Sequence, residues 1–414
     1  MINYIRALKI LQNSKIKIQN EIVLSKESIN RISAKNIFSP SNYPAGNNTA
    51  FDGYAVNSKD TMGLSKKNKK KFKILKTLAA GDNPNLKKIK KFHSIEVMTG
   101  ALVLKPFDTV IPIETVKYYP STQNPKFIII DKKIPKDNHI RYLGSDFKKG
   151  EKIISEGEVI NSSHLLALKS LGINKILVKK KPKIIFYSTG NEISEKIKLP
   201  SWKIRSSNSH YIKSLSKNSF FEILDGGILR DKDEILFKKL VNKVFKKKID
   251  IIITNGAVSA GKFDFVPKIV KEFKLSKHFK GVAIRPGKPI MFAKFKNKNK
   301  SFFGLPGNPI SSAACFKFFV YPYIREILGM KKEKPFTAVL KKKYSKKKEF
   351  TRFIKSKISI NKKGIIEVEV LKGQESFRIK SLIKSNNWAI FKSGKENFKK
   401  GELIDCFKPL GFQQ

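Results

Sequence analysis

The sequence predicts a multidomain α/β plus β fold, with a central open α/β sheet, an inserted β-rich module and a C-terminal β domain. Its 414 residues exceed the roughly 100–200 residues of one domain and suffice for two to four cores. Patterns of strand, glycine turn and helix alternate from residue 181 to about 328, whereas short β-rich runs fill the chain before 150 and after 331. A helical pattern occurs on both sides of the first β-rich stretch, as an insertion requires.

The predicted boundaries follow these changes of pattern. Apolar residues recur at helical spacing over residues 2–13 and again over 157–172, so we expect a helical N-terminal linker domain interrupted by the β-rich module. The four predicted parts are residues 1–22 with 151–180 (helical), 23–150 (β-rich), 181–328 (α/β) and 329–414 (C-terminal β).

Three buried-strand patterns in the α/β region each end in a loop rich in Gly, Asn or Pro. They are Ile184–Ser188, Ile249–Thr254 and Ser301–Gly304. Open parallel sheets bind ligands at the carboxyl ends of their strands. We therefore expect the three loops to lie at one edge of the sheet and to share a site.

The chain is strongly basic, with 86 Lys and Arg against 33 Asp and Glu and a net charge of +53. Only nine of the 86 are Arg, the residue best suited to bidentate contacts with phosphates and bases. Lysine runs such as Lys66–Lys71 and Lys341–Lys348 are dispersed among turns and helix ends. We interpret the charge as solvated surface, and a polyanion-binding face is the alternative.

Several classes of protein do not fit the sequence. Cys315 and Cys406 lie far apart and belong to no C-x-x-C pair, which argues against a disulfide framework and a thiolate zinc site. No apolar stretch reaches about 18 residues, and the first 21 residues lack a signal-peptide pattern. The five histidines have no metal-ligand spacing. We expect a cytoplasmic protein that binds no membrane.

The loop from Thr254 to Asp264 is the clearest chemical candidate. A strand that leads into small residues and then a helix leaves backbone N–H groups free to bind an oxyanion, although the loop matches neither common nucleotide-binding glycine pattern. The alternative is a tight connection in which Asp264 only favours the helix dipole.

Other candidate residues have structural alternatives of the same kind. Asp231 has capping-box spacing to Glu234, and Asn308 before Pro309 suits a helix N-cap. Asp52-Gly53 is a hairpin signal as well as a candidate carboxylate. Glu192 lies in a strand-end loop without such a structural role and could hold a cation there.

Taken together, these loops resemble the MoeA family of molybdopterin molybdenumtransferases, which also includes the C-terminal domain of gephyrin. The resemblance extends from the first helix to the end of the chain, and the joint occurrence of its motifs in the family order makes it specific. The motifs are Asn48–Val56, Thr99-Gly100-Ala101 with Asp108-Thr109-Val110 and Glu114, Asn138–Gly150, Ser188–Glu192, Val258–Gly261 with Asp264, Arg285–Pro289 and Gly304–Pro309.

The resemblance implies insertion of molybdate into adenylylated molybdopterin, with release of AMP and the molybdenum cofactor. Both substrates are anions, which suits strand-end loops, cationic side chains and a divalent cation, Mg²⁺, on phosphate oxygens. It implies four catalytic carboxylates, of which the last three would also bind metal: Asp52, Glu192, Asp231 and Asp264. It implies that substrate is bound by Thr99, Arg141, Gly190, Gly256, Ser259, Gly261, Arg285, Lys288, Pro306, Gly307 and Asn308.

The resemblance also implies partners. We expect a homodimer in which Asp52, Thr99 and Arg141 close the site across the subunit interface. Molybdopterin adenylyltransferase would supply the substrate and acceptor molybdoenzymes would take the product, with no specific nucleic acid involved. The alternatives are that the chain is itself a molybdopterin adenylyltransferase, although those proteins lack the two β domains, or an inactive scaffold or polyanion-binding protein.

Three positions depart from the family pattern. Asn191 replaces the usual aspartate before Glu192, and Asn255-Gly256-Ala257 replaces a Ser-Gly-Gly stretch. Gly281 stands where a basic residue is expected, with Lys280 beside it as the candidate replacement. These changes leave the carboxylates in place and bear on affinity for the anionic substrate.

Overall fold

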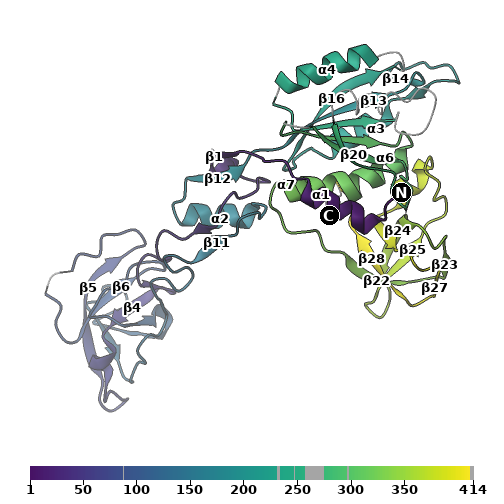
Figure 1. The fold of residues 1–414 in the computed structure, drawn as a ribbon. Coiled ribbons are helices and arrows are strands. Elements are labelled where there is room, and N and C mark those ends of the chain that lie inside the picture. The colour runs from purple at the N-terminus through teal and green to yellow at the C-terminus, as the bar shows by residue number, and fades with distance from the viewer. Residues whose placement is uncertain (87, 231–233, 247, 257–274, 296–297, 411–414) are drawn as a thin grey trace. The chain divides into compact units, whose positions relative to one another are not determined.

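The computed structural model describes residues 1–86, 88–230, 234–246, 248–256, 275–295 and 298–410 (Figure 1). The chain divides into two compact units. The first contains residues 1–35, 156–161 and 175–414, and the second contains residues 36–155 and 162–174.

The first unit begins with helix α1 (Tyr4–Asn13), as the apolar spacing predicts. Asn3 caps it, because its side chain accepts a hydrogen bond from the backbone N–H of Arg6 at 2.8 Å. Ala7 and Leu11 point from α1 into the core of the unit. Strand β1 (Asn20–Leu24) then pairs antiparallel with β12 (Lys175–Lys179). β1 precedes the second unit in the sequence and β12 follows it, so this pairing joins the segment that leads into that unit to the segment that leaves it.

The central sheet of the first unit has six described strands. In sheet order they are β16 (Glu222–Leu229), β13 (Lys183–Thr189), β17 (Ile251–Asn255), β21 (Ser301–Leu305), β20 (Met291–Phe295) and β18 (Leu275–Lys280). The first four are parallel, whereas β20 runs antiparallel to both neighbours. The sheet is therefore open and parallel over four strands and mixed at this edge. β20 is followed directly by β21, and a short connection joins adjacent strands only when they are antiparallel.

Helices cover both faces of this sheet (Figure 1). Ile251 and Ile253 pack with the α3 and α6 side chains, whereas Ile252 between them packs with the α4 side chains. This alternation follows from the period of two in a strand, and burial on both faces explains the continuous apolar run of β17. The helices are α3 (Ser207–Ser214), α4 (Glu234–Lys246), α6 (Pro309–Cys315) and, after one π-helical turn, α7 (Tyr321–Ile327).

The C-terminal part of the first unit is a closed β-barrel. Five strands pair in a ring, because β26 pairs with both β28 and β24, and β19 adds to β24 in parallel. Closure leaves these strands no free edge between them. The strands are β24 (Thr351–Ile360), β25 (Ile366–Val370), β22 (Phe336–Leu340), β28 (Leu403–Phe407), β26 (Asn387–Phe391) and β19 (Ile284–Arg285); a short ladder of β23 (Tyr344–Ser345) with β27 (Asn397–Phe398) and helix α8 (Ile379–Lys384) complete the domain.

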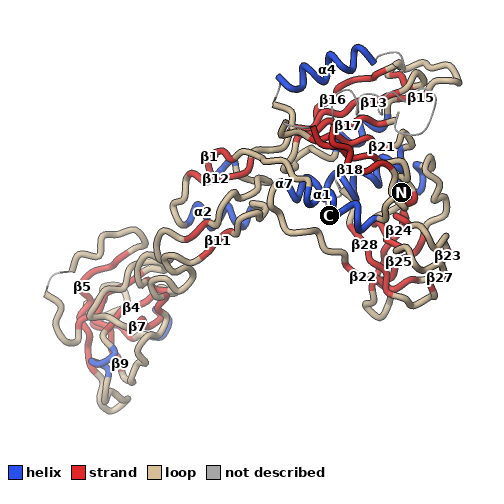
Figure 2. The backbone as a smooth tube through the Cα atoms, viewed as in Figure 1, coloured by secondary structure: helices blue, strands red, loops and turns tan. Residues whose placement is uncertain are grey.

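The regular elements of the second unit are mainly strands, joined by many loops (Figure 2). Its six-stranded mixed sheet has the order β7-β4-β6-β5-β9-β8. Tyr54 packs into the core on one face of the sheet and Ala55 into the core on the other. The strands are β4 (Gly53–Val56), β5 (Lys70–Leu78), β6 (His93–Val97), β7 (Thr109–Pro112), β8 (Lys117–Tyr119) and β9 (Phe127–Ile130), beside the pairs β2 (Ile37–Phe38) with β11 (Lys152–Ile154) and β3 (Asn48–Thr49) with β10 (Ile140–Arg141), and helix α2 (Ser162–Ser170).

The hairpin interpretation of Asp52-Gly53 is wrong. The strands on either side do not pair with each other, since β3 pairs with β10 and β4 pairs with β6 and β7. Gly53 has another role: a Cβ there would lie 2.1 Å from the carbonyl oxygen of Ile111, so glycine lets β4 and β7 approach closely.

The inserted β-rich module, the central open α/β sheet and the C-terminal β domain are thus all present as the sequence predicts. Among the described helices, none has both the length and the apolar character needed to span a bilayer.

Candidate active site

A cleft of about 340 Å³ lies at the carboxyl ends of β13, β17 and β21, where the three loops were expected to meet. Its predicted site residues come from all three loops: Glu192, Gly256, Pro306, Gly307 and Asn308. The start of α3 adds Ser206, Ser207 and Asn208 to the lining. Seven of the sixteen lining residues are Ser, Thr or Asn, which can hydrogen-bond the oxygens of an anionic ligand.

The side chain of Asn255 joins the loop after β17 to the loop after β21 and to the starts of α3 and α6. Its buried side-chain amide donates hydrogen bonds to the carbonyl of Pro306 at 2.6 Å and to Oγ of Ser312 at 3.0 Å. Its amide oxygen accepts one from Nδ2 of Asn208 at 2.7 Å. A serine side chain offers one O–H donor and is shorter, so it could not make the same set of contacts. This departure from the family pattern therefore has a structural role here.

Gly256 follows Asn255 and needs to be glycine. Its φ is +100°, and a Cβ there would lie 2.5 Å from Oγ1 of Thr189. Oγ1 of Thr189 also donates a hydrogen bond to the carbonyl of Asn255 at 3.0 Å. The ends of β13 and β17 consequently approach closely at the floor of the cleft.

The loop after β13 holds Glu192 at the rim of the cleft. Arg230 fixes this loop, since its guanidinium donates hydrogen bonds to the carbonyls of Gly190 at 3.1 Å and Ile193 at 2.6 Å. The Glu192 side chain is exposed, and its carboxylate folds over Gly190, where a Cβ would lie only 2.3 Å from Oε2. The carboxylate is therefore accessible to a ligand.

The third loop leads into α6. Asn308 is the N-cap and Pro309 occupies the first turn, as predicted, but the Asn308 side chain does not cap the helix. Its Nδ2 donates instead to Oγ of Ser376 in the C-terminal domain, at 2.9 Å. The carbonyl of Gly307 accepts a hydrogen bond from Asn208 at 2.7 Å.

A second, larger cleft of about 850 Å³ adjoins the first, and Pro289 lines both. Arg285 and Lys288, both exposed, lie in this second cleft. Other residues of the C-terminal domain complete the lining, and Arg352 of β24 is the register partner of Arg285. The charged lining of this cleft consists of Arg285, Lys288, Lys342, Lys343, Arg352 and Lys372 with only Glu369 and Glu375 of opposite sign. Such a surface attracts anions.

Sequence reasoning did not identify Asn208, Arg352 or Ser376, which the structure places in these clefts. Arg352 lines the cationic cleft, and its buried Nε has no hydrogen-bond partner among the described residues. A signal existed for Arg352, because arginine is rare in this chain. Ser376 and Asn208 stand in no motif that sequence reasoning recognised.

Asp52, Thr99 and Arg141 come together in the second unit. The carboxylate of Asp52 accepts hydrogen bonds from the backbone N–H of Thr99 at 2.6 Å and from its hydroxyl at 2.7 Å. These bonds hold the pKa of Asp52 below its ordinary value. The carbonyl of Thr49 accepts hydrogen bonds from Gly100 N–H at 3.0 Å and from Nη2 of Arg141 at 2.9 Å. All three side chains are exposed and lie around one turn.

Four of the predicted site residues lie outside the described residues: Asp231, Ser259, Gly261 and Asp264. Within the described part of the chain, no group of three or more His, Cys, Asp or Glu side chains could hold a metal ion. Of the predicted metal ligands, Glu192 alone is described.

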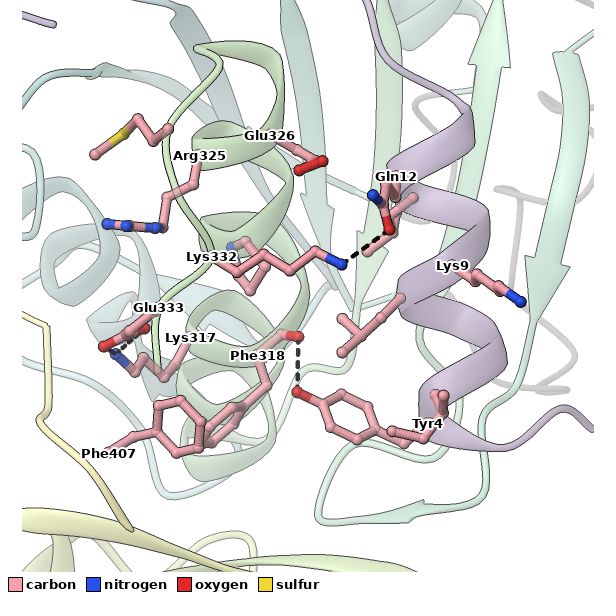
Figure 3. A pocket seen from close by; sticks show the side chains of 15 residues that line it. Tyr4, Lys9, Gln12, Lys317, Phe318, Arg325, Glu326, Lys332, Glu333 and Phe407 are labelled. Carbon is pink, nitrogen blue, oxygen red and sulfur yellow. Dashed lines mark hydrogen bonds and ion pairs between the residues drawn. The ribbon is translucent and has the colours of Figure 1, made fainter. Parts of the chain in front are cut away.

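An apolar groove of about 430 Å³ lies elsewhere, between α1 and α7 (Figure 3). Tyr4 and Gln12 of α1 face Phe318 and Lys332 across it, and Lys317 forms an ion pair with Glu333 at 2.7 Å. No predicted site residue lines this groove.

Models of three family regions match the chain in order. They are the MoeA N-terminal region (domain I and II) over residues 2–172, the probable molybdopterin binding domain over 185–326 and the MoeA C-terminal region (domain IV) over 337–408.

Full-length relatives match as well. A molybdopterin molybdenumtransferase of Haemophilus influenzae is 32% identical over 404 residues, covering 96% of this chain and 95% of the relative. One of Staphylococcus epidermidis is 29% identical, covering 96% and 93%. The crystal structure of a molybdopterin biosynthesis MoeA protein from Pyrococcus horikoshii has a TM-score of 0.82 at 26% identity and covers 98% of this chain and 99% of that one. The chain belongs to the MoeA family, as its fold, its motifs and its relatives agree.

Proposed function

We propose that this protein is a molybdopterin molybdenumtransferase, which inserts molybdate into adenylylated molybdopterin and releases AMP. The observation that carries the proposal is the pair of adjoining clefts: one polar cleft at the strand ends and one cationic cleft beside it, which share Pro289. Two anionic substrates that must react with each other need two adjoining anion sites.

The strand-end cleft suits the phosphoanhydride of the adenylylated substrate. Its loops contribute small residues that let phosphate oxygens approach the backbone, at Gly256 and Gly307 in particular. The Asn255 contacts to Pro306, Ser312 and Asn208 hold these loops before the ligand arrives. A site arranged in advance stabilises developing negative charge without reorganising during the reaction.

The cationic cleft suits molybdate. Arg285, Lys288 and Arg352 all line it, and Arg352 of β24 is the register partner of Arg285 of β19. Molybdate is a small dianion with several oxygen acceptors, so two neighbouring guanidinium groups and an ammonium group in one cleft suit it. Arginine donors also bind such oxyanions in a fixed geometry.

Glu192 fits a role as a Mg²⁺ ligand. Mg²⁺ prefers oxygen ligands and is held by one or two carboxylates together with substrate phosphates. Glu192 offers an exposed carboxylate at the rim of the phosphate cleft. Asp231 and Asp264 would be the other carboxylates. When bound, Mg²⁺ would neutralise charge on the anhydride oxygens as the bond to AMP breaks.

Asp52, Thr99 and Arg141 complete the site in this proposal, from the partner protomer of a homodimer. Their exposure, and their grouping around one turn of a separate unit, support such a role. Molybdopterin adenylyltransferase is the proposed donor of the substrate, and acceptor molybdoenzymes are the proposed recipients. We place the reaction in the cytoplasm, where a reducing environment suits the buried thiols of Cys315 and Cys406.

The decisive experiment supplies purified protein with adenylylated molybdopterin, molybdate and Mg²⁺ and measures AMP and active cofactor. We expect both products, and neither when molybdate is left out. A parallel reaction with molybdopterin and ATP tests the adenylyltransferase alternative, for which adenylylated molybdopterin would be the product. A folded protein that forms neither product would contradict the proposal and favour an inactive scaffold.

A further inference from the structure

Lys355 of β24 is a fully buried lysine, with 0% of its surface exposed. Its Nζ donates hydrogen bonds to three backbone carbonyls, of Gly373 at 2.8 Å, Glu375 at 3.3 Å and Arg378 at 3.0 Å. An ammonium group has three donors, and each of them has an acceptor here. A buried charge is costly unless it is satisfied in this way, so the arrangement commits the segment 373–378 to one position.

Other side chains fix a slightly longer segment, residues 371–378, which we call the 371–378 loop. Oε1 of Gln374 accepts a hydrogen bond from the backbone N–H of Lys355 at 3.1 Å, and Nε2 donates to the Lys355 carbonyl at 2.8 Å. Oγ of Ser381 donates to the carbonyl of Gly373 at 2.6 Å. The loop is therefore held to β24 by side-chain contacts that centre on Lys355.

The 371–378 loop forms much of one wall of the cationic cleft, from Leu371 to Phe377. It also contacts the start of α6, because the carbonyl of Ser376 accepts a hydrogen bond from Ile310 N–H at 3.0 Å and its Oγ accepts one from Asn308 at 2.9 Å. Movement of this loop would therefore change the width of the cationic cleft and the position of Asn308 in the strand-end cleft.

We propose that Lys355 is a positioning residue for the cationic cleft: its buried ammonium fixes the 371–378 loop and thereby sets the affinity for the oxyanion substrate. The identity of the oxyanion as molybdate rests on the proposed function, whereas the contacts of Lys355 with the loop do not. Burial lowers the pKa of Lys355 to about 8, with Glu375 raising it and Arg378 lowering it further. The group is thus charged at neutral pH and supplies all three donors.

The test replaces Lys355 by methionine, which keeps the length of the side chain but removes every donor. We expect faster amide hydrogen exchange in the 371–378 loop, and an about tenfold rise in the KM for molybdate and in the dissociation constant for molybdate measured by calorimetry. The KM for adenylylated molybdopterin should change much less, because Asn255 still holds the strand-end loops. Any fall in kcat should not exceed that of Asn308→Ala, because the loop reaches the strand-end cleft through the Asn308 contact.

Lys317→Met is the matched control. Lys317 is also nearly buried, with 3% of its surface exposed, and loses a contact with Glu333 in the substitution, but it lines the groove between α1 and α7 and neither cleft (Figure 3). We expect some loss of thermal stability, with wild-type loop exchange and wild-type molybdate affinity.

The outcomes separate this inference from the proposed function. If the wild-type protein releases no AMP, the proposed function fails, while molybdate calorimetry and loop exchange still test Lys355. A folded Lys355→Met protein with wild-type loop exchange and molybdate affinity would overturn the inference. Should that variant not fold, Ser381→Ala removes a weaker contact to the same loop, and we expect the same changes at about threefold size. Wild-type values for Ser381→Ala would then overturn it.

Discussion

Nδ2 of Asn308 donates a hydrogen bond to Oγ of Ser376 at 2.9 Å, and this contact joins the strand-end cleft to the cationic cleft. Asn308 stands at the N-cap of α6, the position where an asparagine side chain ordinarily bonds the helix backbone. Here the side chain is turned to the C-terminal domain instead. The contact therefore relates two walls of the candidate active site to each other.

The first prediction concerns this contact. Asn308→Ala should lower the free energy of unfolding by less than the roughly 1 kcal/mol typical of a lost N-cap, because the side chain makes no cap bond. It should nevertheless lower the rate of AMP release by about tenfold or more. Combined with Ser376→Ala, the two effects on AMP release should not add, with a coupling free energy of about 1 kcal/mol. Denaturant unfolding and steady-state kinetics measure both quantities. Strictly additive effects would show that the contact has no part in catalysis.

The second prediction concerns the charge of Glu192. Glu192→Gln should keep the fold, since exposed substitutions usually change the unfolding free energy by less than about 0.5 kcal/mol. AMP release should fall by about a hundredfold or more, because the metal ion loses a negatively charged ligand. Asp264→Asn should behave in the same way.

Glu195→Gln is the control for this prediction, because Glu195 is exposed in the same segment but does not line the cleft. It should keep wild-type turnover. Unchanged turnover in both Glu192→Gln and Asp264→Asn would remove the metal-site assignment.

The third prediction concerns the pH dependence of Asp52. Its pKa lies below the ordinary value of about 3.9, because the hydroxyl and N–H of Thr99 both stabilise the carboxylate. A carboxyl group whose pKa is lower in the folded state stabilises the folded protein when the pH is above its ordinary, unfolded-state pKa. This contribution disappears as the pH falls through the lowered, folded-state pKa. Carboxyl NMR of labelled aspartate in Thr99→Val should show the pKa of Asp52 rising towards the ordinary value. An unchanged pKa would mean that the hydroxyl does not hold the carboxylate in solution.

β13, β17 and β21 could be predicted because each is a short apolar run that ends in Gly, Asn or Pro. β16, β20 and β18 were not predicted, since Asp225-Gly226-Gly227, Lys294 and Lys277 interrupt their apolar patterns. β16 and β18 are the edge strands of the sheet, whereas β20 lies between β21 and β18 and is buried except for Lys294. The domain boundaries at residues 22, 150, 180 and 328 stay predictions.

Local motifs identified the loops of the candidate site but not how the site is assembled. Glu192, Gly256 and Asn308 stand at strand ends, so the order of strands brings them to one cleft. Arg352 and Ser376 reach the site from a barrel whose position depends on packing between domains, and sequence spacing carries no information about that. Lys355 reads in the sequence as one more surface lysine, although it is fully buried.

The fourth prediction concerns the oligomer. If the active site is shared across a homodimer, inactive Asp52→Ala mixed with inactive Asp264→Ala should regain part of the activity, since about half of the dimers formed by random exchange would be hybrids. Each hybrid would contain one site with neither substitution. Light scattering at micromolar concentration should give the dimer mass. A monomer, or no recovery after verified exchange of protomers, would contradict a shared site.

The fifth prediction concerns the net charge of +53. A true nucleic-acid site with six to ten phosphate contacts would lose about 10³–10⁵ in affinity between 50 and 200 mM salt and would still prefer particular sequences or structures. The basic side chains are mostly lysines and are spread over separate features: Lys70 and Lys71 begin β5, whereas Lys342 and Lys343 line the cationic cleft. We therefore expect weak association with DNA that does not depend on sequence and is largely lost at physiological salt through screening. Fluorescence anisotropy with DNA duplexes of different sequence at 150 mM salt measures this association. Selective binding with a submicromolar dissociation constant would revive the nucleic-acid alternative. If molybdate competes with the weakly bound DNA, part of that DNA binding takes place at the cationic cleft.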